Sequence, residues 1–320
     1  MAVDILSVTL RALSFLALFQ AAGIALFLAL REQQLPKTDS ALQRIGTLAA
    51  LIAAALCLGQ YFLEAARMSG GLDGVFDAAL QGMVLRSAVS ATLSWRLLGL
   101  VLIVAGLWFR GTAGRTAGIT GVVVLLASFT FVGHTSKDAV RWLLSPVLLV
   151  HLSAVAFWYG SLLPLYLVSS REPPQTAASV VQEFSARAVR LVPALLLAGL
   201  ILATVLLPNL TALHRPYGEL LLAKVAGFCV LMLFAAMNRW RFGPALRLGD
   251  RAAGRRFRQV VGAEFLLLAT VLCVTAAMTT FFSPEGEQPH ARPHTAHADD
   301  PRRSAIVCGE KVVDSLTRCL

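Results

Sequence analysis

The stretch Ala12-Leu-Ser-Phe-Leu-Ala-Leu-Phe-Gln-Ala-Ala-Gly-Ile-Ala-Leu-Phe-Leu-Ala-Leu30 contains no charged side chain. A transmembrane helix needs about 20 mostly apolar residues to cross a hydrocarbon core about 30 Å thick. The stretch is too long for the apolar region of a secretory signal, and it ends at Arg31 and Glu32 instead of a small-residue cleavage site. It therefore predicts a membrane-spanning helix, with Arg11 near its other end.

The rest of the chain has the same character. Of its 320 residues, 57% are hydrophobic and only 14% are charged, and the mean hydropathy is +0.71. An ordinary soluble domain carries roughly 25% charged residues. Because every backbone polar group in lipid must be paired within the protein, only helices or closed barrels span a membrane. The long apolar runs do not alternate, so they favour helices.

Further apolar runs extend this prediction to an all-α, polytopic membrane helix bundle with about eight transmembrane helices. A short amphipathic helix is expected near 75–85, in the longest loop. We expect a transmembrane domain over 1–283 and a polar, disordered periplasmic tail over 284–320. The predicted spans are roughly Ile5–Leu30, Ile45–Ala66, Ser94–Phe109, Ala117–Val132, Trp142–Val168, Ala188–Leu207, Leu220–Met237 and Val260–Phe281.

Basic residues predict how the bundle is oriented. Loops on the cytoplasmic side of a membrane carry an excess of Lys and Arg. With both termini outside, the inner loops hold most of these residues, and the same orientation places every histidine on the outer side or in the outer part of a span. The last inner loop alone contains Arg239, Arg241, Arg247, Arg251, Arg255, Arg256 and Arg258.

His151 is the strongest candidate for a functional side chain. It lies inside the fifth span, roughly 13 Å below the outer end at 1.5 Å per residue. An ionisable side chain at such a depth is costly and indicates function. Pro146 removes a helix hydrogen bond one turn above it, and Trp158 shares its helix face. The alternative is a neutral histidine bonded to a neighbouring helix.

Two other histidines lie close to this outer end. His134 follows the fourth span and is expected either to approach His151 or to cap a helix end. His214 lies in the outer loop before the seventh span, where it is a candidate ligand or a solvated side chain. Lys224, at the start of the seventh span, is expected to reach outward or to pair with Glu64 or Glu219, in a structural ion pair or beside a metal site.

Sulfur side chains suggest which metal is involved. Met68 and Met83 fall in the longest outer loop, where a packing role explains them less well than it explains Met278 in the last span. Soft thioether ligands select cuprous copper. The cysteines inside spans are expected to be small apolar filler. The tail adds His290, His294 and His297, which either collect metal weakly or belong to a plain linker.

Two other charged residues are placed within spans. Glu264, in the last span, is expected to pair with an arginine of the last inner loop, and Arg96 is expected to reach the headgroups. The sequence contains no Walker A loop, no Asp-based phosphorylation motif and no nucleophile elbow. We therefore expect neither ATP-driven pumping nor an enzyme.

Four segments together resemble the copper resistance protein D (CopD) family. They are His151-Leu-Ser-Ala-Val-Ala-Phe-Trp-Tyr-Gly-Ser-Leu-Leu-Pro-Leu165, Tyr217-Gly-Glu-Leu-Leu-Leu-Ala-Lys224, Asn238-Arg-Trp-Arg-Phe-Gly-Pro-Ala-Leu246 and Glu264-Phe-Leu-Leu-Leu-Ala269. The resemblance covers about 132–281, and the first four spans are similar mainly in layout. It implies an eight-helix protein of the bacterial inner membrane that is linked to copper entry, often beside a periplasmic CopC-type copper carrier.

The sequence thus predicts a multi-pass protein of the bacterial inner membrane that accepts copper ion at the periplasmic face and moves it toward the cytoplasm. The candidate metal ligands are His151, His134, His214, Met68 and Met83. The expected partners are copper ion, the lipid bilayer and a CopC-type carrier, with no nucleic acid. The alternatives are a haem-b membrane cytochrome with two axial histidines across helices, or a non-transporting docking or sensor protein.

Overall fold

The computed structural model describes residues 2–31, 34–131, 141–206, 216–247 and 251–281, and these contain helices and turns but no strand. Eight of the helices are long and apolar enough to cross a membrane, which confirms the predicted number. The tail over 284–320 lies outside the described residues. The eight helices are α1 (Ala2–Leu30), α2 (Asp39–Ser69), α4 (Ala88–Trp108), α5 (Gly111–Ala127), α7 (Arg141–Arg171), α8 (Pro174–Leu206), α9 (Pro216–Met237) and α11 (Arg251–Phe281).

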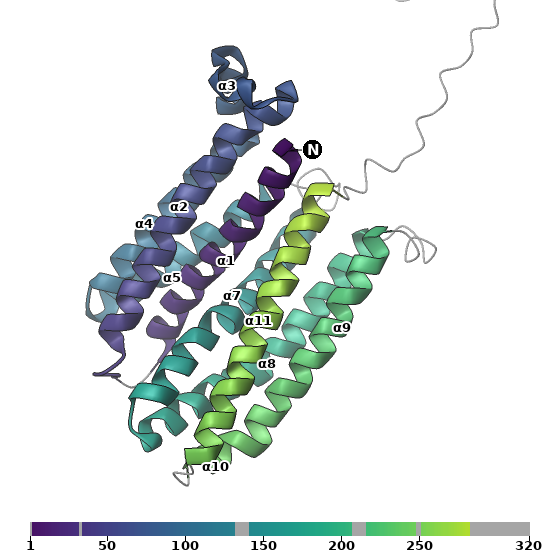
Figure 1. Ribbon diagram of the computed structural model, residues 1–320. Coiled ribbons are helices and arrows are strands. Elements are labelled where there is room, and N and C mark those ends of the chain that lie inside the picture. The colour runs from purple at the N-terminus through teal and green to yellow at the C-terminus, as the bar shows by residue number, and fades with distance from the viewer. Residues whose placement is uncertain (1, 32–33, 132–140, 207–215, 248–250, 282–320) are drawn as a thin grey trace, which may run out of the picture. The chain divides into compact units, whose positions relative to one another are not determined.

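The expected loop helix is also present, as two short pieces between α2 and α4. They are the 3-10 turn η1 (Leu72–Phe76) and the helix α3 (Ala78–Leu85). Asp77 starts α3 because its Oδ1 accepts hydrogen bonds from the backbone N–H groups of Ala79 (2.8 Å) and Leu80 (3.1 Å). Figure 1 shows α3 at the same end as the chain's N-terminus. We call this the amino-terminal end, and the opposite one the arginine-rich end.

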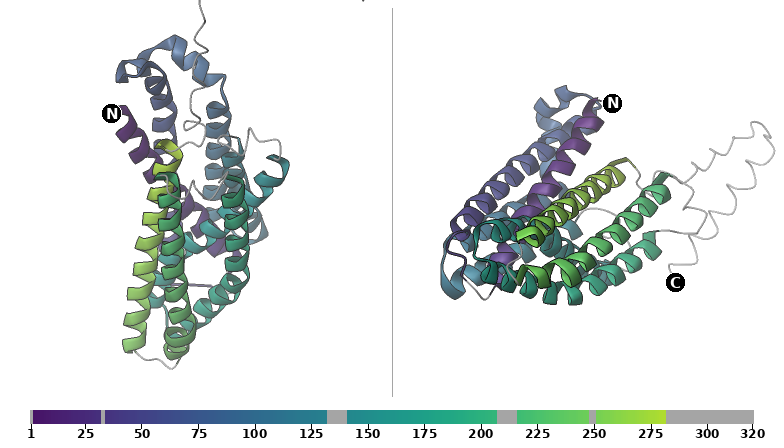
Figure 2. Two further views of the ribbon diagram at one scale, coloured as in Figure 1. Left: turned by 90° about the vertical axis from the view of Figure 1, so that its right-hand side faces the viewer. Right: turned by 60° about the horizontal axis from the view of Figure 1, so that its bottom comes forward.

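The eight spans form two groups of four. α1, α2, α4 and α5 pack among themselves, as do α7, α8, α9 and α11. Contacts of α1 with α7 and α11 provide most of the connection between the groups, as Figures 1 and 2 show. In the apolar part of α1, 67% of the residues are buried, against 6% for α9. α1 is therefore the central helix, and the apolar side chains that α9 exposes suit contact with lipid.

Glycines allow α1 and α7 to touch through their backbones. A Cβ atom added to Gly160 of α7 would lie 2.7 Å from the carbonyl oxygen of Phe19 and even closer to Gly23 of α1. Beside this contact, Gln20 Nε2 of α1 donates a hydrogen bond of 3.2 Å to the carbonyl oxygen of Gly160. Small residues at such crossings let membrane helices approach closely, so packing holds them together without a hydrophobic driving force.

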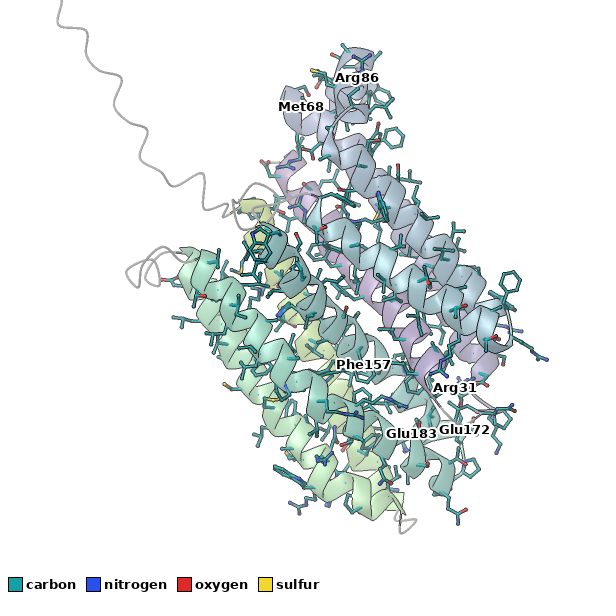
Figure 3. The ribbon with its side chains drawn as sticks, turned by 180° about the vertical axis from the view of Figure 1, so that it is seen from behind. Arg31, Met68, Arg86, Phe157, Glu172 and Glu183 are labelled. Carbon is teal, nitrogen blue, oxygen red and sulfur yellow. The ribbon has the colours of Figure 1, made fainter. Side chains whose placement is uncertain are left out.

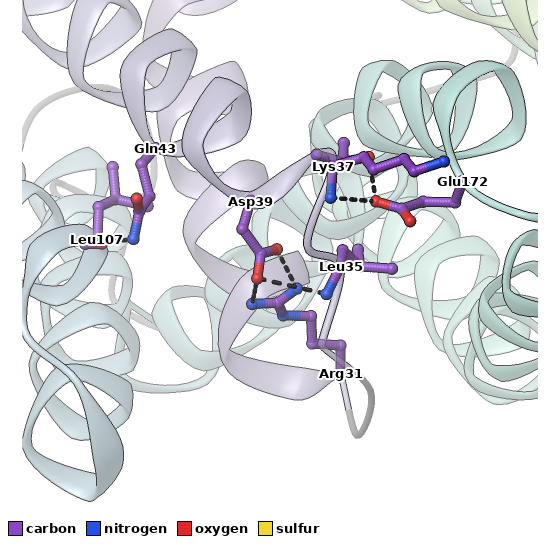
Figure 4. A network of polar contacts seen from close by, with 8 residues as sticks. Arg31, Leu35, Lys37, Asp39, Gln43, Leu107 and Glu172 are labelled. Atoms are coloured by element: carbon purple, nitrogen blue, oxygen red, sulfur yellow. Dashed lines mark hydrogen bonds and ion pairs between the residues drawn. The ribbon is translucent and has the colours of Figure 1, made fainter.

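A polar network joins the two groups at the arginine-rich end (Figure 4). Glu172, which lies between α7 and α8, accepts hydrogen bonds at Oε1 from Lys37 N (3.0 Å) and from Thr38 Oγ1 (2.8 Å). Arg31 and Asp39 form an ion pair in the same α1–α2 connection. The buried Glu172 carboxylate therefore fixes the start of α2 against the second group.

We expect Glu172→Ala to lower the free energy of unfolding by about 1–3 kcal/mol, because it leaves the buried Thr38 hydroxyl and the partly buried Lys37 N–H without their acceptor. Glu172→Gln keeps an oxygen acceptor at the same place and should cost much less. Unfolding in detergent, followed by circular dichroism, measures both variants. Equal stabilities of the two variants would mean that the hydrogen bonds contribute little.

The last connection is a widened helical turn. After α9 the chain forms the π-helical turn η4 (Asn238–Phe242) and then the short helix α10 (Gly243–Arg247). π-helical turns are rare and occur frequently at functional sites. Here the turn begins at Asn238, which lies beside α11.

Candidate metal-binding site

His151 lies in the amino-terminal half of α7, about 15 Å along the helix from Arg141 at 1.5 Å per residue. Its Nδ1 atom is 3.4 Å from the carbonyl oxygen of Leu195 in α8. A carbonyl oxygen can only accept, so Nδ1 carries the hydrogen in this contact. The neutral ring then has its lone pair on Nε2, the arrangement in which a backbone carbonyl orients a metal-binding imidazole.

Two residues of neighbouring helices complete the surroundings of the imidazole. A Cβ atom on Gly199 of α8 would lie 3.3 Å from His151 Cε1, so this glycine makes room for the ring. Lys224 of α9 lies close enough to His151 to interact with it electrostatically. Glu64 instead forms an ion pair of 3.1 Å with Arg67, so the predicted pairing of Lys224 with Glu64 is wrong. α9 packs chiefly against α11 and the turn that follows α9, whereas α2 packs against α1 and α4.

The predicted sulfur ligands lie elsewhere. Met68 at the end of α2 and Met83 in α3 are about half exposed (52% and 51%), and α3 packs against α2 and α4. Figure 3 shows Met68 at the tip of the amino-terminal end, beside Arg86 and well separated from Phe157 of α7. The structure therefore does not bring these two methionines to His151. Met278 is 4% exposed and packs within the bundle.

The other two predicted ligands, His134 and His214, lie outside the described residues. Within the described ranges, no group of three or more His, Cys, Asp or Glu side chains could hold a metal ion. His151 is the one histidine in those ranges, so the facing pair of histidines that a haem needs is not found there. Cys57 is buried and Cys273 is partly buried, as expected for small apolar filler, whereas Cys229 is exposed on α9.

Arg96 contacts side chains inside the bundle and does not reach the lipid headgroups as predicted. Its Nε donates a hydrogen bond of 3.3 Å to Ser128 Oγ, and its guanidinium carbon lies 4.6 Å from the centroid of the Phe129 ring. The guanidinium is also within hydrogen-bonding reach of the Cys57 thiol. The aromatic face and two polar atoms inside the first group thus replace the headgroups as its partners. Sequence alone does not show that Phe129 and Ser128 face α4.

Glu264 of α11 is 2% exposed and lies near the middle of its helix. Its Oε1 accepts a hydrogen bond of 2.6 Å from Asn238 Nδ2, and the Trp158 indole is within hydrogen-bonding reach. The predicted pairing with an arginine is wrong for the arginines whose side chains are described. Arg239 donates to Ser185 Oγ (2.7 Å) and Arg258 to the carbonyl oxygen of Ser169 (3.1 Å).

Three consecutive aromatic residues of α7 separate His151 from the arginine-rich end. Each is almost fully buried, and each contacts a ring on a different helix of the second group. The ring pairs are Phe157 with Phe184 of α8 (5.1 Å between centroids), Trp158 with Phe228 of α9 (6.4 Å) and Tyr159 with Phe265 of α11 (4.9 Å). We call these three residues the aromatic layer.

On the other side of the aromatic layer, charged side chains join the apolar ones. A small pocket there is lined by apolar residues that include Phe157, by Arg31, which follows α1, and by Glu183 and Arg187 of α8. Figure 3 shows Phe157, Arg31 and Glu183 near one another. Glu183 and Arg187 form an ion pair of 3.5 Å, and Arg187 also donates to the carbonyl oxygen of Leu30 (2.7 Å). The site thus runs from an imidazole, past aromatic rings, to ionic side chains.

These features define a class, a polytopic helical membrane protein with an imidazole and a carboxyl group placed inside the bundle. The model of the copper resistance protein D-like N-terminal domain matches residues 1–142, and the model of copper resistance protein D matches residues 178–278. The chain belongs to the copper resistance protein D family. The first match covers α1, α2, α4 and α5 and so extends the resemblance to the first four spans, while the second covers most of α8, α9 and most of α11.

The segment 143–177, which contains His151 and the aromatic layer, lies between the two matched regions. The role of His151 therefore rests on its position and contacts. No curated protein and no solved structure matches the chain. The family nevertheless links this multi-pass membrane protein to copper resistance and homeostasis.

Proposed function

We propose that the protein accepts copper ion at the periplasmic face of the bacterial inner membrane and moves it toward the cytoplasm. The observation that carries the proposal is the orientation of His151. Leu195 holds Nδ1, Gly199 makes room for the ring, and Nε2 is left with a lone pair inside a bundle of the copper resistance protein D family. A neutral imidazole nitrogen suits copper as a ligand.

The proposed direction rests on charge. Cytoplasmic ends of membrane helices are enriched in Lys and Arg. The arginine-rich end carries Arg31 after α1, Arg239 and Arg241 in η4, and Arg255, Arg256 and Arg258 near the start of α11. Exposed tryptophans occur at both ends, with Trp95 and Trp142 at the amino-terminal end and Trp108 and Trp240 at the other. Such belts occupy the two membrane interfaces. In this orientation His151 lies in the periplasmic half.

In the proposed pathway, His134 and His214 take copper from solvent or from a CopC-type carrier and deliver it to His151. Both belong to the connections that precede α7 and α9, the helices that hold His151 and Lys224. Met68 and Met83 lie farther out, where half-exposed thioethers suit capture of cuprous ion from a carrier. The chain would act as a transporter and not as an enzyme.

Purified protein in liposomes tests the proposal. Copper is added outside, a copper-sensitive dye is trapped inside, and protease treatment of an arginine-rich-end tag reports which end faces outward. Dye response that requires the amino-terminal end to face the added copper supports inward transport. Copper binding without any dye response would favour a docking or sensor protein, and a Soret band in the purified protein would favour a cytochrome.

The double variant Met68→Leu, Met83→Leu tests the capture role. We expect the copper concentration for half-maximal uptake to rise several-fold, while the maximal rate stays close to that of the wild type, because these half-exposed thioethers belong to α2 and α3 and not to the helices around His151. Uptake measured over a range of cuprous concentrations separates the two quantities. An unchanged concentration dependence would remove both methionines from the pathway. Met278→Leu, which alters a buried packing residue, is the control.

A further inference from the structure

Glu264 is a buried carboxyl group that the metal site does not use. Its neighbours come from two other elements, since Trp158 belongs to α7 and Asn238 to η4, while Glu264 itself belongs to α11. Both partners are neutral, which leaves a carboxylate here without a compensating cation among the side chains described. An ionisable residue inside a membrane bundle is costly and marks an ion or proton pathway by default.

Among the side chains that the structure describes, the Trp158 indole and the Asn238 amide are the two that hydrogen-bond to Glu264, and both are neutral. The Arg247 side chain of α10 is not described. Charged or titratable side chains on α11 and on the elements packed against it have other partners: Arg11 bonds to Thr279, Arg239 to Ser185 and Arg258 to Ser169, while Tyr159 stacks on Phe265 and Lys224 lies near His151.

The Asn238 amide suits either protonation state of this carboxyl group. Its Nδ2 donates to Glu264 Oε1, as a carboxylate requires, while its Oδ1 is buried without a hydrogen-bond partner. Turning the amide over would present Oδ1 to the carboxyl, where it can accept the hydrogen of a protonated acid. The next residue, Arg239, is exposed, so Asn238 lies between Glu264 and the surface of the arginine-rich end.

We infer that Glu264 is a proton-binding site that is linked to metal occupancy at His151. The proton resides on Glu264 when the bundle is empty and leaves by way of Asn238 to water at the arginine-rich end when copper ion binds. The carboxyl O–H bond breaks, the electron pair stays on the carboxylate, and the metal keeps its oxidation state. This inference rests on the proposed function, because it names the regulation of that same site.

The distance along α7 supports such a linkage. Trp158, which reaches Glu264, follows His151 by two helical turns, about 10 Å at 1.5 Å per residue. The Trp158 indole adds a side chain's length to this path, and a unit charge about 15 Å away, in surroundings with an effective dielectric constant near 20, changes proton affinity by roughly sixfold. A cation held at His151 therefore favours the ionised form of Glu264, and protonation of Glu264 weakens cation binding to the same degree.

The test measures proton release on copper binding by the purified full-length protein in detergent. Cuprous ion is added in weak buffer at several pH values between about 5 and 9, the interval around neutrality in which a linked group would titrate. A pH indicator and the bound copper are read in the same sample. We expect Glu264→Gln to bind copper but to release fewer protons per copper than the wild type. Glu172→Gln is the matched control, since it also neutralises a buried glutamate and keeps its acceptor.

A second measurement needs no copper. Infrared spectroscopy of the metal-free protein should show a carboxyl C=O band that shifts or disappears with rising pH in the wild type and is missing in Glu264→Gln. Equal proton release by both proteins, or no band that depends on Glu264, overturns the inference. Failure of the wild type to bind copper would instead count against the proposed function, while the infrared result still decides whether Glu264 binds a proton.

Discussion

Replacing His151 with alanine is expected to reduce copper uptake to the level of liposomes without the protein. Alanine removes the one imidazole that the described residues place within the bundle. Loss of a partner that merely orients a ligand already lowers metal affinity by about 10- to 100-fold, so loss of the ligand itself should cost no less. Copper content of the purified variant and dye response in liposomes measure the effect.

Two controls make this result specific. Ser153→Ala, on the same helix, removes a hydroxyl without removing a nitrogen ligand, and should leave uptake unchanged. Gly199→Ala keeps His151 but adds a methyl group 3.3 Å from Cε1, so it should disturb the ring and give an intermediate rate. Wild-type uptake by a folded His151→Ala protein would exclude the imidazole as a required ligand.

Gly160→Val is expected to have the largest effect on folding. The side chain would overlap the backbone of α1 at Phe19 and Gly23, and neither can move without separating the two groups of helices. Inserting atoms into a packed interior typically costs about 1–3 kcal/mol and occasionally more. Because the obstacle here is backbone, the cost should lie at or above the top of that range. The yield of monodisperse protein and the midpoint of thermal unfolding both measure it.

Gly262→Val in α11 is the matched control, since a Cβ atom there meets nothing within 4 Å. Both substitutions place the same β-branched residue inside a long helix, so the difference between them isolates the α1–α7 contact. Similar stabilities for the two variants would mean that this contact does not hold the groups together.

The number and order of the spans could be predicted because lipid imposes a length and a composition on each of them. The residues at which the helices begin and end could not be predicted, as α8 and α11 show. α8 begins at Pro174 and α11 at Arg251, although their apolar runs begin near Ala188 and Val260. Hydropathy detects the part of a helix that lies in hydrocarbon, whereas these helices continue as amphipathic turns that carry arginines.

The partners of intramembrane charges were the least predictable part of the site. Arg96 and Glu264 are predicted to meet headgroups and an arginine, yet their neighbours are Phe129 and Asn238. For Lys224 the sequence leaves open an outward position, an ion pair or a place beside the metal site, and in the structure it lies near His151. The order of the spans does not determine which faces of two helices meet. Neutral amides and aromatic rings also carry no charge that would identify them in the sequence as partners of a charged residue. The one available signal was that Trp158, Asn238 and Glu264 all fall in segments that resemble the family.

The aromatic layer also restricts how anything can cross this protein. Phe157, Trp158 and Tyr159 are almost fully buried, and each packs against a ring of a different helix, so aromatic side chains fill the interior of the second group next to His151 along α7. In the proposed transport, a copper ion that leaves His151 toward the arginine-rich end would meet these rings, so its passage would require them to change rotamer.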